Sequence, residues 1–362
     1  MLTLIITVII VALIFEYING FHDTANAIAT TVGTNVLSPR NAIILATVTN
    51  LIGALVGTAV AKTITSGLVD ASYVTSMTII CALTGGIVWN LVTWWYGLPS
   101  SSSHAMIGGL LGATVASAHD NWSSIIWMKD KGGPWFKNDG VLYKVFIPMI
   151  SSPILGLICG FLFMAVLYLA LQKVYQSEWV QKLFGKLQLL SSAYMGFAHG
   201  SNDAQKIMGI IALSLLAATK AGDLQNVPAW LEFLKHPMVT LADGTQTIAP
   251  WIKIMCALVM AAGTAAGGWK IINTLGYKLT ELKPIHGFAA ETTSATILLF
   301  AAKLGMPVST THSITTSIMG VGLAKKEGKS LCFGTAGRIL FAWVLTIPAT
   351  FLLAYVLRKV TM

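Results

Sequence analysis

Two short blocks of polar residues occur twice in this sequence, in the same order each time. The first block, GFHDTAN at 20–26, returns as GSNDAQK at 200–206. The second block, GLPSSSSH at 97–104, returns as GMPVSTTH at 305–312. Carboxylates and amides offer oxygen ligands to a cation, whereas hydroxyls at the start of a helix offer donors to an anion. The blocks therefore indicate a duplicated site that could hold ions of both signs.

The first block places acids in strongly apolar surroundings. An ionisable residue inside an apolar helix costs about 2.5–3.5 kcal/mol, so it needs a partner or a purpose. In both copies a glycine precedes the aspartate by one helical turn, which favours a local helix break whose carbonyls could bind a small hard cation. Lys206 could form an ion pair with Asp203 or contact an anion. The predicted cation ligands are Asp23, Asn26, Asn202, Asp203, Gln205 and Glu291.

The second block predicts an anion site. Proline favours the first turn of a helix, and the hydroxyls and free amides after it then face whatever precedes that turn. Two such helix ends brought together would surround a tetrahedral anion with donors. The alternative is that serine and threonine only permit close helix packing. The candidate hydroxyls are those of Ser101, Ser102, Ser103, Ser309, Thr310 and Thr311.

His199 directly precedes the second acidic block, where structural hydrogen bonding is expected, and three histidines lie within the blocks, namely His22, His104 and His312. Imidazole titrates near neutrality, so these residues are candidates for a proton relay. Structural hydrogen bonding, including capping of the hydroxyl-rich turns, is the alternative for each of them.

The composition indicates the class of protein in which these residues lie. It is 55% hydrophobic and 10% charged, with a mean hydropathy of +0.73, whereas an ordinary soluble domain is about 25% charged. Ten apolar stretches, each suited to a bilayer of roughly 30 Å, predict an all-α integral membrane protein with about 10–12 transmembrane or re-entrant helices. Basic residues are scattered over the loops, so nucleic-acid binding is not indicated. The apolar stretches are approximately 2–34, 41–61, 76–96, 98–118, 143–172, 187–219, 252–269, 285–303, 304–324 and 339–357.

The repeated blocks divide the chain into two similar halves. Residues 1–172 form the first predicted transmembrane repeat, 173–186 a linker and 187–362 the second repeat. Five crossings in each half would place the halves in opposite orientations, as in transporters built from inverted repeats. The N-terminus and the linker would then face opposite sides. The segments 98–118 and 304–324 are rich in Gly, Ser and Thr, which is typical of short or re-entrant helices rather than of lipid-facing spans.

At the paired blocks the sequence resembles the PiT family of inorganic phosphate transporters, whose duplicated signature is Gly-x-Asn-Asp-x-x-Asn. The first copy here has His22 in place of the leading Asn, and the second has Lys206 in place of the final Asn. These departures resemble the bacterial low-affinity branch of the family. The Pro-led segments at 99–104 and 307–312 match the family as well, and so do the order of the blocks and the inverted halves.

The resemblance implies a secondary active symporter, not an enzyme, that imports phosphate across the plasma (inner) membrane. It implies coupling to H⁺ or Na⁺, a homodimer embedded in lipid, both termini outside and no cofactor. Phosphate would be held by Ser102, Ser103, Thr310 and Thr311, and the cation and substrate centre would comprise Asp23, Asn26, Asn202 and Asp203. Histidine at 22 and lysine at 206 alter a neutral-oxygen site. The branch that the chain most resembles favours protons and carries phosphate as a neutral complex with Mg²⁺ or another divalent metal.

Three other functions use similar residues. A transporter of another tetrahedral oxyanion such as sulfate could share the whole scaffold. An anion channel would use the same helix ends but would not need duplicated acids. An intramembrane hydrolase could use Asp, Ser and His, although no motif of such an enzyme is present.

Overall fold

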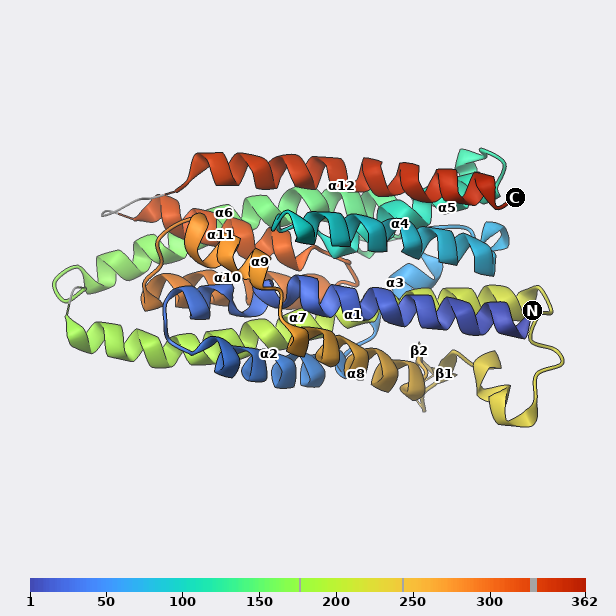
Figure 1. The fold of residues 1–362 in the computed structure, drawn as a ribbon, viewed down its shortest axis with the longest axis horizontal. Coiled ribbons are helices and arrows are strands. Elements are labelled where there is room, and N and C mark those ends of the chain that lie inside the picture. Colours follow the sequence, from blue (N-terminus) through green and yellow to red (C-terminus); the bar gives the residue numbers. More distant parts are fainter. Residues whose placement is uncertain (176, 243, 326–330) are drawn as a thin grey trace.

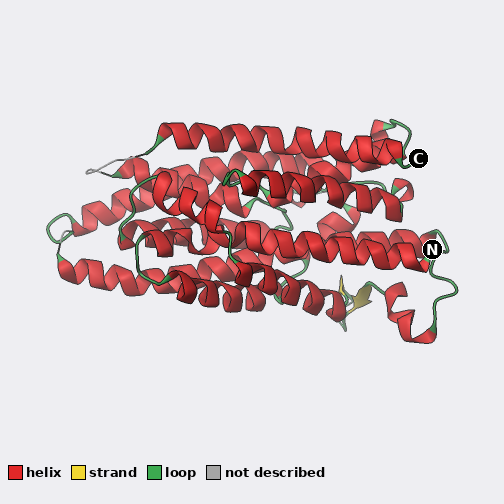
Figure 2. Cartoon of the chain, in the orientation of Figure 1, coloured by secondary structure: helices red, strands yellow, loops and turns green. Residues whose placement is uncertain are grey.

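The computed structural model describes residues 1–175, 177–242, 244–325 and 331–362. Long helices lie side by side along the longest axis of the molecule (Figure 1). Both termini lie at one end of this bundle, and the connection between α6 and α7 lies at the other end. The predicted all-α architecture is confirmed, and Figure 2 shows strands only in one small hairpin.

Twelve α-helices occur in the described residues, and one of them, α9, has five residues. The first half contains α1 (Leu2–Gly33), α2 (Pro39–Ala54), α3 (Ala59–Ser66), α4 (Ser76–Trp95), α5 (Ser102–Ser117) and α6 (Ile147–Leu171). The second half contains α7 (Glu178–Lys220), α8 (Pro250–Ala266), α9 (Trp269–Asn273), α10 (Pro284–Lys303), α11 (Thr310–Ala324) and α12 (Phe333–Val360).

Shorter elements connect these helices. The 3-10 turns are η1 (Ala71–Tyr73), η2 (Trp122–Ser124), η3 (Trp135–Lys137) and η5 (Ala229–Lys235), and the π-helices are η4 (Leu142–Phe146) and η6 (Thr274–Lys278). Strands β1 (Met238–Thr240) and β2 (Gln246–Ile248) pair antiparallel. Because α7 already begins at Glu178, most of the segment predicted as a linker is helical.

Several helices are suited to crossing a membrane. By length and composition, α1, α4, α12 and the continuous helix over 142–171 qualify singly. Two further pairs qualify together, α2 with α3 and α8 with the helix over 269–278, although they bend by 65° and 60°. In contrast, α5 and α11 are short and buried along nearly their whole length. This burial agrees with the prediction that these two helices do not face lipid.

The predicted helix breaks at the repeated glycines are wrong. Helices α1 and α7 pass through Gly20 and Gly200 without interruption. A Cβ at Gly20 would lie 2.4 Å from the carbonyl oxygen of Met260, and one at Gly200 would lie 2.2 Å from that of Asn50. These glycines therefore allow helix backbones to touch, as small residues do in membrane bundles.

Four extensive helix contacts join helices from different halves. Helix α1 packs on α8, and α7 packs on α2; likewise α5 packs on α12, and α6 packs on α11. Within the first half α1 and α4 run in the same direction, since Phe15 meets Gly86 and His22 meets Thr93.

This packing predicts different effects for two glycines of α7. We expect Gly200→Ala to destabilise the protein by about 1–3 kcal/mol, because its methyl group would overlap a backbone carbonyl that cannot move away alone. Gly185 has open space around its Cβ position, so Gly185→Ala should leave stability unchanged or raise it by up to about 1 kcal/mol. Thermal unfolding in detergent measures both. Equal melting temperatures for the two variants would contradict the role assigned to Gly200.

Candidate functional site

The hydroxyl-rich segments form two helix N-termini with the same cap. Ser101 accepts a hydrogen bond from the backbone N–H of His104 at 3.2 Å, and Ser309 accepts one from that of His312 at 3.1 Å. The prediction that the prolines occupy the first helical turn is therefore wrong. They lie two residues before the cap. Serine is a preferred N-cap because its oxygen satisfies an amide that has no partner within the helix. Ser101 and Ser309 thus hold the helix ends in shape.

Asp203 of α7 is the most highly connected residue of the acidic blocks. It forms an ion pair with Lys206 and accepts a hydrogen bond of 2.6 Å from the hydroxyl of Thr310. Lys206 also donates to Ser103 Oγ and, at 2.9 Å, to the carbonyl of Val308. The ion pair of Lys206 with Asp203, which the sequence left open, therefore joins α7 to the starts of both α5 and α11.

Asp23 of α1 lies across from this pair and has fewer partners. Its Oδ1 is 2.8 Å from His22 Nδ1 and accepts a long hydrogen bond of 3.4 Å from Thr311. Asn26, one turn further along α1, donates to Thr311 Oγ1 at 2.9 Å. His22 Nε2 is 3.2 Å from the hydroxyl of Thr93, so this histidine forms structural hydrogen bonds on both sides of its ring.

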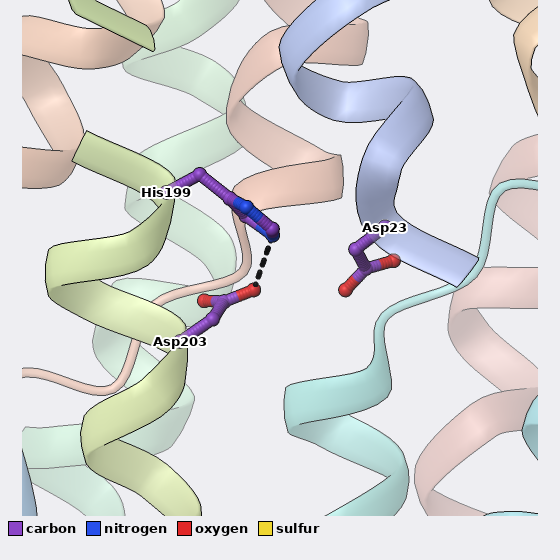
Figure 3. Close-up of side chains that lie close together, drawn as sticks. All are labelled: Asp23, His199 and Asp203. Atoms are coloured by element: carbon purple, nitrogen blue, oxygen red, sulfur yellow. Dashed lines mark ion pairs between the residues drawn. The ribbon is translucent and has the colours of Figure 1, made fainter. Parts of the chain in front are cut away.

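The two aspartates and one histidine form a compact group of ligand atoms. Asp23, His199 and Asp203 each offer one atom, and these atoms lie within 4.8 Å of one another. Figure 3 shows Asp23 on α1 pointing across toward His199 and Asp203, which project from α7. His199 Nε2 is 3.1 Å from Asp203 Oδ2. His199 was not among the predicted ligands, although its spacing of one turn before Asp203 is a signal for a shared helix face.

Three further polar atoms at this centre have no hydrogen-bond partner among the described residues. They are the side-chain oxygens of Asn26, Asn202 and Ser102. Asn202 uses only its amide nitrogen, which donates to Asp203 at 3.2 Å and to the carbonyl of Val308 at 3.0 Å. Buried polar atoms are normally paired, so unpaired ones mark positions that a bound ligand would satisfy.

The centre is closed on all sides in this conformation. Lys206 is 3% exposed, Asp23 2% and Asp203 0%, and Ser103 is the most exposed of the hydroxyl residues at 4%. A small ion bound here would be shielded from water, where electrostatic interactions are strong.

Two predicted cation ligands lie elsewhere. Gln205 accepts a hydrogen bond of 2.9 Å from the backbone N–H of Val60 and so caps the start of α3. Because α7 is an unbroken helix, a residue two positions after Asp203 points to the opposite face. Glu291 of α10 lies in a separate polar nest beside Thr30, about two turns along α1 from Asp23. Its donors are Thr30, Thr31, Gln188 and Ser191.

The other two predicted proton-relay histidines meet each other. The rings of His104 and His312 lie edge to face with centroids 4.7 Å apart, and His312 stacks on Trp343 at 3.9 Å. The Nδ1 atoms of both histidines lack a partner among the described side chains and backbone. Their rings do not cap the helix starts, since Ser101 and Ser309 do so.

The arrangement combines the two chemistries that the sequence predicted. Carboxylate, amide and imidazole atoms face one another across α1 and α7, while the hydroxyls of Ser102, Ser103, Thr310 and Thr311 come from helix ends with free amides. Such a centre can hold a cation and an oxyanion in contact.

Known proteins have similar sequences and a similar fold. Residues 19–354 match the phosphate transporter family. The chain is 41% identical to a probable low-affinity inorganic phosphate transporter of Bacillus subtilis over 350 residues, which span 96% of this chain and 94% of that one. It is 40% identical to one of Mycobacterium bovis over 347 residues, or 96% of this chain and 75% of that one.

A solved structure described as "The sodium-dependent phosphate transporter" has the same fold, with a TM-score of 0.78 over 99% of both chains at 22% identity. The family and these relatives are transporters, which agrees with the apolar helices of the bundle. The chain is therefore a multi-pass integral membrane protein that belongs to the phosphate transporter family.

Proposed function

We propose that the chain is a secondary active symporter that imports inorganic phosphate with H⁺ or Na⁺, by alternating access around the closed centre. One observation carries this proposal. Carboxylate oxygens of Asp23 and Asp203 lie within 4.8 Å of each other, beside two helix N-termini that are rich in hydroxyl side chains. Phosphate would bind to the hydroxyls of Ser102, Ser103, Thr310 and Thr311 and to the free amides. Asn26, Asn202 and Lys206 would complete its contacts.

Electrostatics explains why transport would need a second ion. Two unit negative charges 4 Å apart repel by roughly 4 kcal/mol at an effective dielectric constant near 20. Phosphate therefore binds poorly beside Asp23 and Asp203 unless a cation or proton neutralises charge there. Each ion then raises the affinity for the other by the same factor.

The donor set supports a proton or a divalent metal more than sodium as the ion at this centre. Asp23, His199 and Asp203 include an imidazole nitrogen, which suits borderline divalent metals, whereas hard cations prefer oxygen ligands. We infer that phosphate enters either free or as a complex with a divalent metal that these three residues hold as cargo. Sodium is the alternative that the name of the similar structure suggests.

Glu291 would supply a second cation position. Hydroxyls and an amide surround its carboxylate, and all of them come from α1 and α7. A cation bound there would sit on the same helices that carry Asp23 and Asp203, and would influence their separation.

The two halves would act as inverted repeats, residues 1–172 against 187–362. The exchange of partners described above supports this inference, because α1 with α8 corresponds to α7 with α2, and α5 with α12 to α11 with α6. Rocking of one half against the other would open the centre to each side in turn. The homodimer remains a prediction from the family resemblance.

Substitution of the two aspartates should impair phosphate transport in two distinguishable ways. We expect Asp23→Asn to abolish gradient-driven accumulation of labelled phosphate in proteoliposomes while the protein stays folded, because it removes a carboxylate that would hold a cation beside phosphate. Asp203→Asn should also destabilise the protein by about 3–5 kcal/mol, since it leaves the buried ammonium of Lys206 unpaired. The double variant Asp203→Asn/Lys206→Met should recover stability but not transport. Unimpaired accumulation in both single variants would remove the aspartates from the mechanism.

The hydroxyls predict a loss of affinity for phosphate. Thr310→Val and Thr311→Val should each raise the KM for phosphate about tenfold or more, because a hydrogen bond to a charged group contributes about 1.5–3 kcal/mol. Thr316→Val is the control on the same helix, since that hydroxyl donates to the backbone carbonyls of its own helix at His312 and Ser313. Uptake kinetics with phosphate and with sulfate test the choice of oxyanion. A KM for phosphate that stays at the wild-type value in Thr310→Val and Thr311→Val would contradict the proposed binding mode.

A further inference from the structure

The described part of the chain buries four carboxylates, and three of them have good partners. Asp203 has Lys206 and Thr310, Asp23 has His22, and Glu291 lies among four donors. The fourth is Glu16 of α1, two helical turns before Asp23. It is 0% exposed, and nothing in the proposed binding of phosphate uses it.

The carboxyl group of Glu16 has few hydrogen bonds. Its Oε1 has no partner among the described residues, and its Oε2 receives only a long contact of 3.4 Å from the amide of Asn19. Asn90 of α4 is fully buried too, and neither of its side-chain polar atoms has a partner in the described structure. Since Phe15 meets Gly86 where α1 and α4 run side by side, one turn further brings Asn19 and Asn90 to the same level.

An ionised carboxylate cannot be accommodated cheaply in this environment. Burying a charge without a partner is costly, whereas a neutral carboxylic acid needs only a modest hydrogen bond. The structure therefore suits Glu16 in its protonated form. The charged and titratable groups that act on it are Asp203 and Lys206 from α7, Cys256 from α8 and Asp23 from α1. Helix α4, which packs on α1, contains no charged residue.

We propose that Glu16 is the residue that binds the coupling proton of phosphate import, an inference that rests on the proposed symport. One proton from the solvent on the side of phosphate entry binds the carboxylate and gives a neutral acid. The same proton leaves to the solvent on the other side when phosphate is released. Asn19, which donates to Glu16 Oε2 at 3.4 Å, orients the acid two helical turns before Asp23.

The distance between Glu16 and Asp23 along α1 determines how strongly proton binding and phosphate binding affect each other. Two helical turns place Glu16 about 10 Å from Asp23. At that distance and an effective dielectric constant near 20, one unit charge changes the affinity for another by about tenfold. Neutral Glu16 therefore favours phosphate binding, and bound phosphate favours protonation of Glu16. Phosphate affinity should rise as the pH falls through the range in which this carboxyl titrates.

Glu16→Gln, which resembles the protonated acid, tests this assignment. In proteoliposomes it should lose accumulation of labelled phosphate driven by a pH gradient, while phosphate–phosphate exchange stays within about twofold of wild type. The affinity for phosphate should lose the part of its pH dependence that one bound proton supplies, about tenfold in total over the pH range in which the proton binds. Glu178→Gln is the matched control, because Glu178 is exposed and forms a surface ion pair with Lys182. Phosphate's own ionisation is the same for all variants.

Two further measurements keep the outcomes distinct. Glu16→Asp should retain the pH dependence, and infrared difference spectra should show a protonated-carboxyl band in the wild type that is absent from Glu16→Gln. Proton-driven accumulation by Glu16→Gln at the wild-type level, or a wild-type spectrum without that band, would overturn the assignment. Wild-type accumulation driven by sodium alone would overturn it too, yet leave phosphate symport intact. A wild-type protein that accumulates no phosphate under any gradient would instead refute the proposed function.

Discussion

An excess of buried negative charge is the constraint on which this structure depends. Four carboxylates lie inside the described bundle, and one ammonium group, that of Lys206, contacts one of them. Because buried charges need partners, the pair of Lys206 with Asp203 determines where Ser103 and Val308, and with them the starts of α5 and α11, are held. The negative charge that this pair leaves uncompensated repels an anion. These charges are the basis of our proposal that phosphate transport depends on a second ion.

Unbroken helices give this charge its arrangement. One face of α1 carries polar side chains at regular helical spacing. The carboxylates of Glu16 and Asp23 and the hydroxyl of Thr30, which contacts Glu291, therefore lie along the same side of the helix. The polar residues of this face are Glu16, Asn19, Asp23, Asn26 and Thr30. This face lies within ligand distance of α7, since ligand atoms of Asp23, His199 and Asp203 are within 4.8 Å of one another. Because the residues proposed to bind phosphate and the coupling ion lie on one continuous helix, they would move together when the halves move.

Much of the fold and part of the site could be predicted from the sequence. Apolar stretches located the helices, and the duplicated blocks identified Asp23 and Asp203 together with the hydroxyl residues that the structure brings beside them. The position of Gln205 was wrong because a helix break was assumed at Gly200, whereas that glycine serves close packing. His199 was missed because its one-turn spacing from Asp203 matters only if the helix is continuous. The isolation of Glu16 depends on what surrounds it in three dimensions, which spacing along the chain does not reveal.

Phosphate binding to the purified protein, with H⁺, Na⁺ and Mg²⁺ varied separately, tests the central claim most directly. Calorimetry in detergent measures the affinity without any need for transport. If buried negative charge controls the site, at least one of these ions must raise the affinity for phosphate, and phosphate must raise the affinity for that ion by the same factor. An affinity for phosphate that is indifferent to all three ions would contradict the account.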